Sequence, residues 1–511
     1  MRRKPETLDL DDIQGLILRG YGGLPAAHYL ILHIADPVRA RHGLRGLLPR
    51  ITDGYSDDAR RQAVHVAFTY SGLERLGLNT KTLRSFPRPF REGMARRNLL
   101  LGDCGASAPE RWRWGGPQDK EVHALLLLFA REPDLTHPAA PHPTDDPNAS
   151  LAELAERGKQ DLIHAVRHRL QDSGLEVLEA LDTRTLIERK EHFGFHDGIA
   201  QPMLHARRLT GKRHVHEDNL VAPGEFILGY RNEYGRLPDS PTVSAVHDPL
   251  GLLPRRSDGR HDLGRNGSYL VFRQLRQDVH AFWRFVDECA ARDGAADPAA
   301  RDRLAAKMVG RWPSGAPLVL APDADDPALG GRDDFGYHDA DPYGERCPIA
   351  AHVRRTNPRD VMQPGPARYA VPGKKDSTRQ AKRHRLLRRG RAYGDPLHPA
   401  MTPDAFLRAG DDGAERGLHF LCLNANLTRQ FEFVQHTWIN NTKFGGLYDA
   451  ADPIVGTHDP HGEGRLGIFC APDAPVRQRL CDVPTFVTMR GGAYFFLPGI
   501  RALRYLAAGL P

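Results

Sequence analysis

One short stretch places an ionisable pair between two glycines. It reads Phe193-Gly-Phe-His-Asp-Gly-Ile-Ala-Gln-Pro202, with Asp197 directly before Gly198. Glycines let the backbone approach a ligand closely, and apolar neighbours would raise the pKa of the Asp197 carboxyl towards the range useful for moving protons. The stretch therefore predicts acid/base chemistry. Taken alone, however, the same motif more often marks a tight turn in which the aspartate bonds its own backbone.

A second candidate is a histidine that follows a small, apolar approach. In Cys347-Pro-Ile-Ala-Ala-His-Val-Arg-Arg-Thr-Asn-Pro-Arg359, His352 precedes three arginines. A neutral imidazole beside a flat apolar cofactor, with guanidinium groups near the cofactor's carboxylates, is what a haem iron needs from a protein. The chain has 25 histidines, so His352 stands out only by this context.

A third candidate lies in a basic run. Nine of the 18 residues from Lys374 to Arg391 are Lys or Arg, which on composition alone indicates a solvated face or a phosphate-binding patch. Residues 386–393 nevertheless alternate like a half-buried strand, which would turn Arg388 inward beside Leu386. A buried arginine needs an anion. No P-loop pattern surrounds Gly373, so nucleotide binding has no support.

The first half of the chain alternates strand and helix patterns. Strands are expected at 28–34, 63–70, 122–130 and 175–181, helices at 37–49 and 151–171, and a Pro-rich loop at 133–147. Two β-α-β units in this order predict a split-βαβ, ferredoxin-like domain.

The second half looks like an elaborated copy of the first. After a polar connection at 231–266, we expect strands at 268–275 and 417–423, helices at 279–291 and 427–438, and a terminal hairpin of 485–489 and 494–497. The prediction is an α+β fold of two ferredoxin-like domains with antiparallel sheets. Residues 1–230 would form the domain that carries the G-x-x-D-G loop, and 231–511 the second domain.

Composition indicates an ordinary globular protein. The 511 residues are 40% hydrophobic, and a net charge of +7 suits an anionic ligand without requiring nucleic acid. The six cysteines contain no C-x-x-C, so neither structural zinc nor covalent haem is indicated, and reduced thiols in a cytoplasm are expected. No apolar run approaches the roughly 20 residues of a membrane span. We therefore expect a cytoplasmic protein with no membrane or nucleic-acid partner.

Three motifs, taken together and in order, resemble the dye-decolorizing (DyP-type) haem peroxidases. They are Gly194-Phe-His-Asp-Gly198, the stretch 347–359 and Leu386-Leu-Arg388. The likeness extends through 11–15, 68–73, 91–94, 224–230, 307–312 and 490–496, and the length resembles the larger fungal-like and actinobacterial branch. The resemblance implies a non-covalent haem b held mainly by the second half. It also implies hydrogen peroxide and a bulky phenolic or anthraquinone-type reductant as substrates.

The resemblance also assigns roles to residues. It implies that His352 is the iron ligand, and that Asp197 and Arg388 form the distal pair that moves a proton and stabilises charge. Further residues are expected around the haem: Gly198, Ile199 and Ala200 along its edge, Asn357 and Arg359 near its propionates, and Glu432 as the acid that hydrogen-bonds the iron-ligating histidine. A haem-handling protein with incidental peroxidase turnover is the alternative. A basic nucleic-acid-binding protein is a weaker one, because no recognised module is present.

Overall fold

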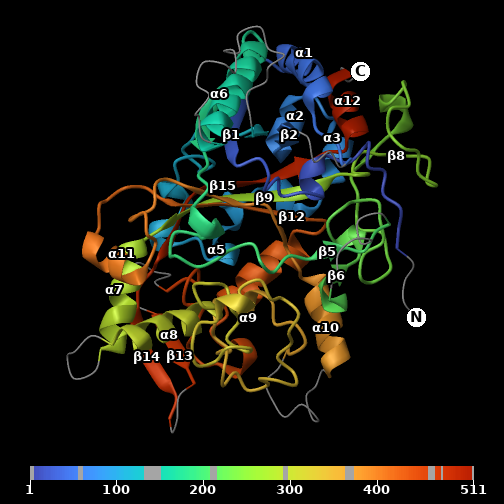
Figure 1. Cartoon of the computed structure of the whole chain (residues 1–511). Coiled ribbons are helices and arrows are strands. Elements are labelled where there is room, and N and C mark those ends of the chain that lie inside the picture. The colour runs from blue at the N-terminus through green and yellow to red at the C-terminus, as the bar shows by residue number, and fades with distance from the viewer. Residues whose placement is uncertain are drawn as a thin grey trace.

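One antiparallel sheet runs through the whole molecule. The computed structural model describes residues 5–55, 61–131, 151–207, 216–291, 297–362, 373–458, 467–472 and 476–508. The sheet has the order β10-β12-β9-β15-β2-β3-β1-β4, and β11 pairs with β12 at one edge. The predicted loop at 133–147 lies outside the described residues. In Figure 1, helices α1, α6 and α12 lie above the sheet, while α7 to α10 and β13–β14 lie below it.

The first half forms a ferredoxin-like unit, as predicted. Its strands are β1 (Ala26–Ile34), β2 (Gln62–Phe68), β3 (Ala124–Ala130) and β4 (Leu175–Asp182), and its main helices are α1 (Pro37–Leu47) and α6 (Leu151–Leu170). Asp36 starts α1 by accepting hydrogen bonds from the backbone N–H groups of Val38 and Arg39. Short helices between β2 and β3 are α2 (Tyr70–Arg75), α3 (Thr80–Arg84), α4 (Arg88–Glu92) and α5 (Asn98–Leu101).

The second half repeats this topology. Its strands are β9 (Ser268–Gln277), the pair β10 (Leu387–Arg388) and β11 (Arg391–Tyr393), β12 (Gly417–Asn424) and β15 (Val487–Leu497). The sheet order is β2-β3-β1-β4 in the first half and β10-β12-β9-β15 in the second. In both halves the second strand along the chain therefore lies at one edge, followed by the third, the first and the fourth. The two units share one sheet because β15 pairs with β2 at Phe496 and Phe68. The fold class is therefore confirmed, whereas the boundary at 230/231 stays a prediction.

The remaining elements decorate these two units. They are α7 (Val279–Ala290), α8 (Pro298–Val309), α9 (His352–Thr356), α10 (Lys374–Arg383), α11 (Pro403–Ala409), α12 (Ile500–Ala508), the hairpin β13 (Gly467–Ala471) with β14 (Gln478–Val483), and the two-residue strands β5 (Met203–Leu204), β6 (Leu220–Val221), β7 (Thr242–Val243) and β8 (His261–Asp262). Residues 427–438, predicted as a helix, form wide π-helical turns at Thr428–Glu432 and Val434–Ile439.

The predicted C-terminal hairpin is wrong. Residues 487–497 form the single long strand β15, and its register against β9 shifts between Met489 and Gly491. Two glycines occur there because a neighbouring ring lies against the strand: a Cβ on Gly491 would lie 2.5 Å from Nε1 of Trp114. The Gly-Gly pair therefore marks a β-bulge under a tryptophan and not a turn.

Both faces of the sheet are buried. Side chains on one face join α1, α6 and α12 in one core, as Leu30 and Val66 do, and side chains on the other face form a second core around Tyr29 and Phe272. A third core lies around α7 and α8 and includes Phe282 and Trp283.

All six cysteines are free thiols. Among the described residues, no helix combines the length and the apolarity needed to cross a membrane.

Candidate active site

A cavity of about 470 Å³ brings the predicted residues together. Strands β9, β12 and β15, helix α9 and the 193–202 turn all contribute to its wall. Seven of the nine predicted site residues line it: Asp197, Gly198, Ile199, Ala200, His352, Asn357 and Arg388. The other two, Arg359 and Glu432, are not among the lining residues.

Aromatic packing fixes the turn that carries Asp197. Phe195 stacks on the ring of Trp283 at 6.1 Å, and Trp283 donates its indole N–H to the carbonyl of Phe193 at 3.0 Å. Gly194 and Gly198 have φ values of 94° and 81°, which favour glycine. The turn was assigned to the first domain, yet it packs against helix α7 of the second half.

Asp197 and Arg388 form an ion pair in the cavity. Nη1 of Arg388 lies 2.9 Å from Oδ1 of Asp197, and the backbone N–H of Arg388 donates to the side chain of Gln201. Burial raises the pKa of Asp197, but the Arg388 charge and the Gly198 N–H outweigh it, so the pKa lies below its ordinary value. The upward effect expected from burial is present, but it is smaller than the opposing effects together. The carboxylate stays ionised in mild acid.

The turn interpretation of the motif is also correct. The backbone N–H of Gly198 donates to Oδ1 of Asp197 at 2.6 Å. One carboxylate oxygen thus accepts both from its own turn and from Arg388. The local bond orients the side chain towards the cavity, so the turn interpretation and the acid/base prediction apply to the same structure.

The basic run divides into two parts. Lys374–Arg383 forms helix α10, whereas Arg388 lies on β10. Arg389 points to the other side, where its Nε donates to the carbonyl of Leu16 at 2.7 Å, and Arg391 donates to the carbonyls of Tyr21 and Pro25. The strand parity predicted for Arg388 therefore holds, although Arg389-Gly390 interrupts the strand.

His352 begins helix α9 and is held by a buried carboxylate. Its Nδ1 lies 2.9 Å from Oδ2 of Asp452, whose Oδ1 accepts from the backbone N–H groups of Ile454 and Val455. Burial lowers the pKa of His352, but the Asp452 charge outweighs that effect and raises it. With Nδ1 engaged, Nε2 is the nitrogen available for a metal.

The prediction for Glu432 is wrong, because Asp452 holds that position. Glu432 is buried elsewhere: its Oε2 accepts from Nη2 of Arg97 at 2.8 Å, and its Oε1 accepts from the hydroxyl of Tyr494 at 3.0 Å. Asp452 stands 100 positions from His352, so no short motif links the two residues. The Asp452-Pro453 pair signals a turn, but nothing in the sequence says which histidine that turn meets.

Buried arginines contribute to the cavity wall. Arg311 and Arg385 line it together with Asn357, whose side-chain Oδ1 and Nδ2 have no hydrogen-bond partner among the described residues. Burial lowers the pKa of Arg385 to about 10, and its Nη1 donates to Oδ1 of Asn219 at 3.2 Å. Buried guanidinium groups and an unpartnered amide provide for an anionic group such as a carboxylate.

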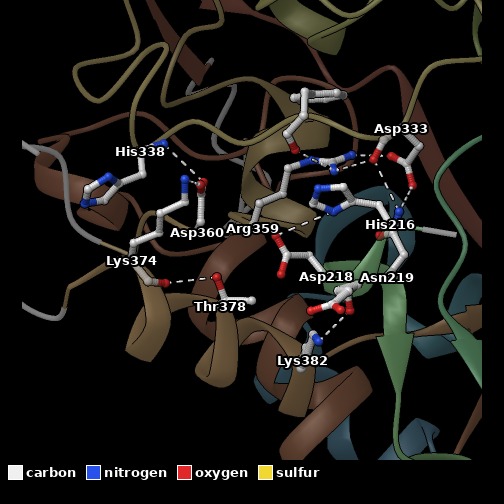
Figure 2. Close-up of polar contacts among 12 residues, drawn as sticks. His216, Asp218, Asn219, Asp333, His338, Arg359, Asp360, Lys374, Thr378 and Lys382 are labelled. Carbon is white, nitrogen blue, oxygen red and sulfur yellow. Dashed lines mark hydrogen bonds and ion pairs between the residues drawn. The ribbon is translucent and has the colours of Figure 1, made fainter. Parts of the chain in front are cut away.

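Arg359 is not a lining residue of the cavity, but it shares a carboxylate partner with Arg311, which is. Its guanidinium bonds Asp333 and lies 3.8 Å over the ring of Phe335. Figure 2 shows Arg359 directed at Asp333, which also accepts from Nδ2 of Asn219 at 2.9 Å. Asp333 thus links Arg359 to Arg311, because its Oδ1 also lies 3.3 Å from Nη2 of Arg311. The role predicted for Arg359 at a cofactor carboxylate stays a prediction, and Arg311 and Arg385 were missed.

The donor set fits a haem. Valine, leucine and phenylalanine side chains, among them Val309, Val353 and Phe420, line the wall of the cavity. One imidazole carries a carboxylate on its Nδ1, one acid pairs with an arginine, and the buried arginines Arg311 and Arg385 belong to the wall. An apolar wall suits a flat ring, the imidazole suits iron, and the cations suit the carboxylates of the ring. The residues present therefore fit a haem group, and the cavity is the candidate active site.

Comparisons with known proteins make the class specific. The chain is 30% identical to a dye-decolorizing peroxidase of Mycena epipterygia, over 98% of this chain and 88% of the relative. It is 32% identical to a multifunctional dye peroxidase of an Amycolatopsis species, over 97% and 96%. A scan against models of protein families finds no match.

Solved structures agree. An ancestral D-type dye decolorizing peroxidase superposes with a TM-score of 0.73 at 25% identity, over 98% of this chain and 99% of that one. A dye-decolorizing peroxidase in complex with 2,6-dimethoxyphenol gives 0.72 at 26% identity, over 98% and 100%. The chain belongs to the dye-decolorizing peroxidase family, and it is a peroxide-dependent oxidoreductase.

Proposed function

We propose that this peroxidase works with a non-covalent haem b and oxidises bulky phenolic or anthraquinone-type compounds at the expense of hydrogen peroxide. The observation that carries the proposal is the ion pair of Asp197 and Arg388 in the same cavity as His352. A protein that only carries haem needs the histidine and the carboxylate contacts, but no distal acid. The solved relative in complex with 2,6-dimethoxyphenol supports a phenolic substrate.

The residues of the cavity divide the task of holding the cofactor. His352 would bind the iron through Nε2, and Arg311, Arg385 and Asn357 would meet the propionates, with Arg359 supporting them from behind. Gly198, Ile199 and Ala200 would lie along the ring edge. When bound, the haem supplies the electrons that break the peroxide O–O bond and later regains them from the organic substrate.

Asp197 would move the proton. As a carboxylate it accepts the proton of one peroxide oxygen and returns it to the other, which leaves as water. The lowered pKa keeps Asp197 in the accepting form in mild acid. Arg388, always cationic, holds the peroxide and stabilises the negative charge that gathers on the leaving oxygen. Asp452 would orient His352 and increase the basicity of its Nε2.

The test is Asp197→Asn, which keeps the shape and removes the proton acceptor. We expect the second-order rate constant with hydrogen peroxide to fall roughly a hundredfold or more, within the 10²–10⁴ range of general acid–base catalysis. Haem content should not change. Stopped-flow absorbance between pH 3 and 8 measures both the rate constant and its pH profile. An unchanged rate across that range would assign proton transfer to another group and overturn the role of Asp197.

A further inference from the structure

A second carboxylate lies beside Asp197, and the proposed reaction does not use it. Glu191 lines the same cavity. Its Oε2 accepts from the backbone N–H of Phe193 at 2.9 Å, and its Oε1 accepts from the backbone N–H of Phe195 at 3.0 Å. Backbone bonds close the same turn, because the N–H of Glu191 donates to the carbonyl of Phe195 and the N–H of Gly194 donates to the carbonyl of Glu191.

The sheet anchors this carboxylate. Gln277, at the end of β9, donates its Nε2 to Oε2 of Glu191 at 2.6 Å, and Gln277 is only 4% exposed. The Asp197 turn is therefore tied to a central strand by one carboxylate that accepts three hydrogen bonds. Hydrogen bonds to a charged group are stronger than those between neutral groups.

We propose that Glu191 is a positioning residue for Asp197. Its carboxylate fixes the turn of Phe193 to Gly198 and so sets where the Asp197 side chain meets Arg388. The inference rests on the role proposed for Asp197 and extends it to Glu191, which the proposed reaction does not use.

Gln277 can form a hydrogen bond with the Glu191 side chain whether that side chain is ionised or protonated. Burial raises the pKa of Glu191 to about 7, against the opposing hydrogen bonds from Phe193 and Gln277, and the Asp197 charge adds to the rise. A protonated carboxyl would need an acceptor for its own hydrogen. Among the described residues, no donor reaches Oε1 of Gln277, so a turned amide offers that oxygen. Both backbone N–H groups keep their acceptors in either state.

Only a glutamate fits this position. A glutamine has the same length but one acceptor oxygen, so its NH₂ group would face one of the two backbone N–H donors. Glu191→Gln therefore removes one of the two acceptors for the backbone N–H groups of the turn with the smallest change in side-chain size. Glu188→Gln is the matched control, because Glu188 lies three residues earlier with a side chain 65% exposed, paired with Lys190.

The experiment uses the full-length holoprotein and has two measurements. Hydrogen exchange at the amides of Phe193 and Phe195 should accelerate in Glu191→Gln, by at least about tenfold at the amide that loses its acceptor and by less at the amide that keeps the neutral glutamine oxygen. The rate of cyanide binding, followed by absorbance across pH, should also fall about tenfold with a shifted profile, since cyanide must give its proton to a distal base. Glu188→Gln should match the parent in both measurements.

Unchanged exchange and an unchanged cyanide profile in Glu191→Gln would overturn the inference. If Glu191→Gln does not fold, Gln277→Leu removes only the anchor and should give the same changes to a smaller degree, and a parental result in that variant equally overturns the inference. If Asp197→Asn slows the reaction with peroxide and Glu191→Gln does not, the positioning role alone fails. If Asp197→Asn has no effect, the proposed function itself is wrong.

Discussion

Arg388 pairs with a carboxylate, whereas its basic neighbours Arg389 and Arg391 bond backbone carbonyls. Its guanidinium meets the Asp197 carboxylate in the cavity, whereas Arg389 and Arg391 donate to backbone carbonyls on the other side of the strand. Burial lowers the pKa of Arg389 to about 10. Arg388 is therefore placed to act on a reacting anion, and the two neighbours are placed to hold the segment 16–25 against the sheet.

Arg388→Leu should lower the rate constant with hydrogen peroxide roughly a hundredfold, because a preorganised donor at a developing charge is worth about 3 kcal/mol. Arg389→Leu is the matched control one residue away. We expect it to lower the free energy of unfolding by about 1–3 kcal/mol through unpaired carbonyls, with the rate constant of the folded protein kept. Stopped-flow mixing and denaturant titration of both variants separate the effects. Equal, mild losses of rate in both would indicate only the general field of a basic patch.

Residue patterns identified Asp197 and Arg388, which the fold brings together in one cavity, because each motif is local. Their catalytic roles stay predictions. Asp197 and Gly198 are adjacent, and the parity that turns Arg388 inward needs only its neighbours. Asp452, Arg311 and Arg385 could not be found in this way. Asp452 lies 100 positions from His352 in the sequence. Arg311 and Arg385 are candidates for binding an anion because they are buried, and their burial depends on the tertiary fold.

At the scale of elements, β15 shows how a local signal can mislead. A Gly-Gly pair between two apolar runs is typical of a hairpin. Here the strand continues, since Gly491 lies under the ring of Trp114 and Gly492 contacts Met94 and Met489. The glycines provide space for a neighbour that is far away in the sequence, and sequence alone does not reveal that neighbour.

Gly491→Ala should therefore destabilise the protein by about 1–3 kcal/mol, the usual cost of overpacking a buried site. Gly46→Ala is the control with the opposite sign. Gly46 lies in α1, nothing lies within 4 Å of the position of its Cβ, and alanine in a helix is favoured by up to about 1 kcal/mol. Denaturant midpoints of both variants check this pair. A neutral Gly491→Ala would mean that the Trp114 loop moves freely away from β15.

At the scale of the whole molecule, the two ferredoxin-like units meet as one sheet. The alternation of strands and helices predicted each unit, but not the pairing of β15 with β2 through Phe496 and Phe68. Edge-to-edge joining depends on which edges remain free after each unit folds, and the periodicity of one strand does not carry that information. The active-site cavity is likewise shared, because the Asp197 turn packs against α7.

The buried histidines make the fold sensitive to acid. Burial lowers the pKa values of His192, His384 and His419 to about 4, below the ordinary value of 6.5. Between pH 6.5 and 4 the unfolded chain therefore binds protons that the folded chain does not, so stability falls as the pH falls. Each fully buried histidine contributes up to about 1.4 kcal/mol per pH unit. Burial also lowers the pKa values of His123 and His458, which adds to this trend. The carboxyls whose pKa burial raises oppose it: Asp12, Glu191, Glu225 and Asp302.

We expect the free energy of unfolding of the haem-free protein to decrease from pH 7 to pH 4.5, as measured by urea titration. His419→Gln should flatten this dependence, since glutamine can still donate to the carbonyl of Asp182 but does not titrate. Stability that is constant or rises on acidification would show that these histidines reach water or protonate in the folded state.

The central claim is that His352 holds a redox-active haem opposite a working distal pair, and one measurement tests it most directly. The purified chain and His352→Ala are each reconstituted with haem, their visible spectra are recorded, and both are mixed rapidly with hydrogen peroxide. The account predicts a Soret band that shifts within milliseconds to seconds in the parent. In His352→Ala, the band should be lost or should change to that of a haem without a histidine ligand, and its response to peroxide should disappear. A parent that stays colourless, or a His352→Ala variant with the parental spectrum and turnover, would contradict the account.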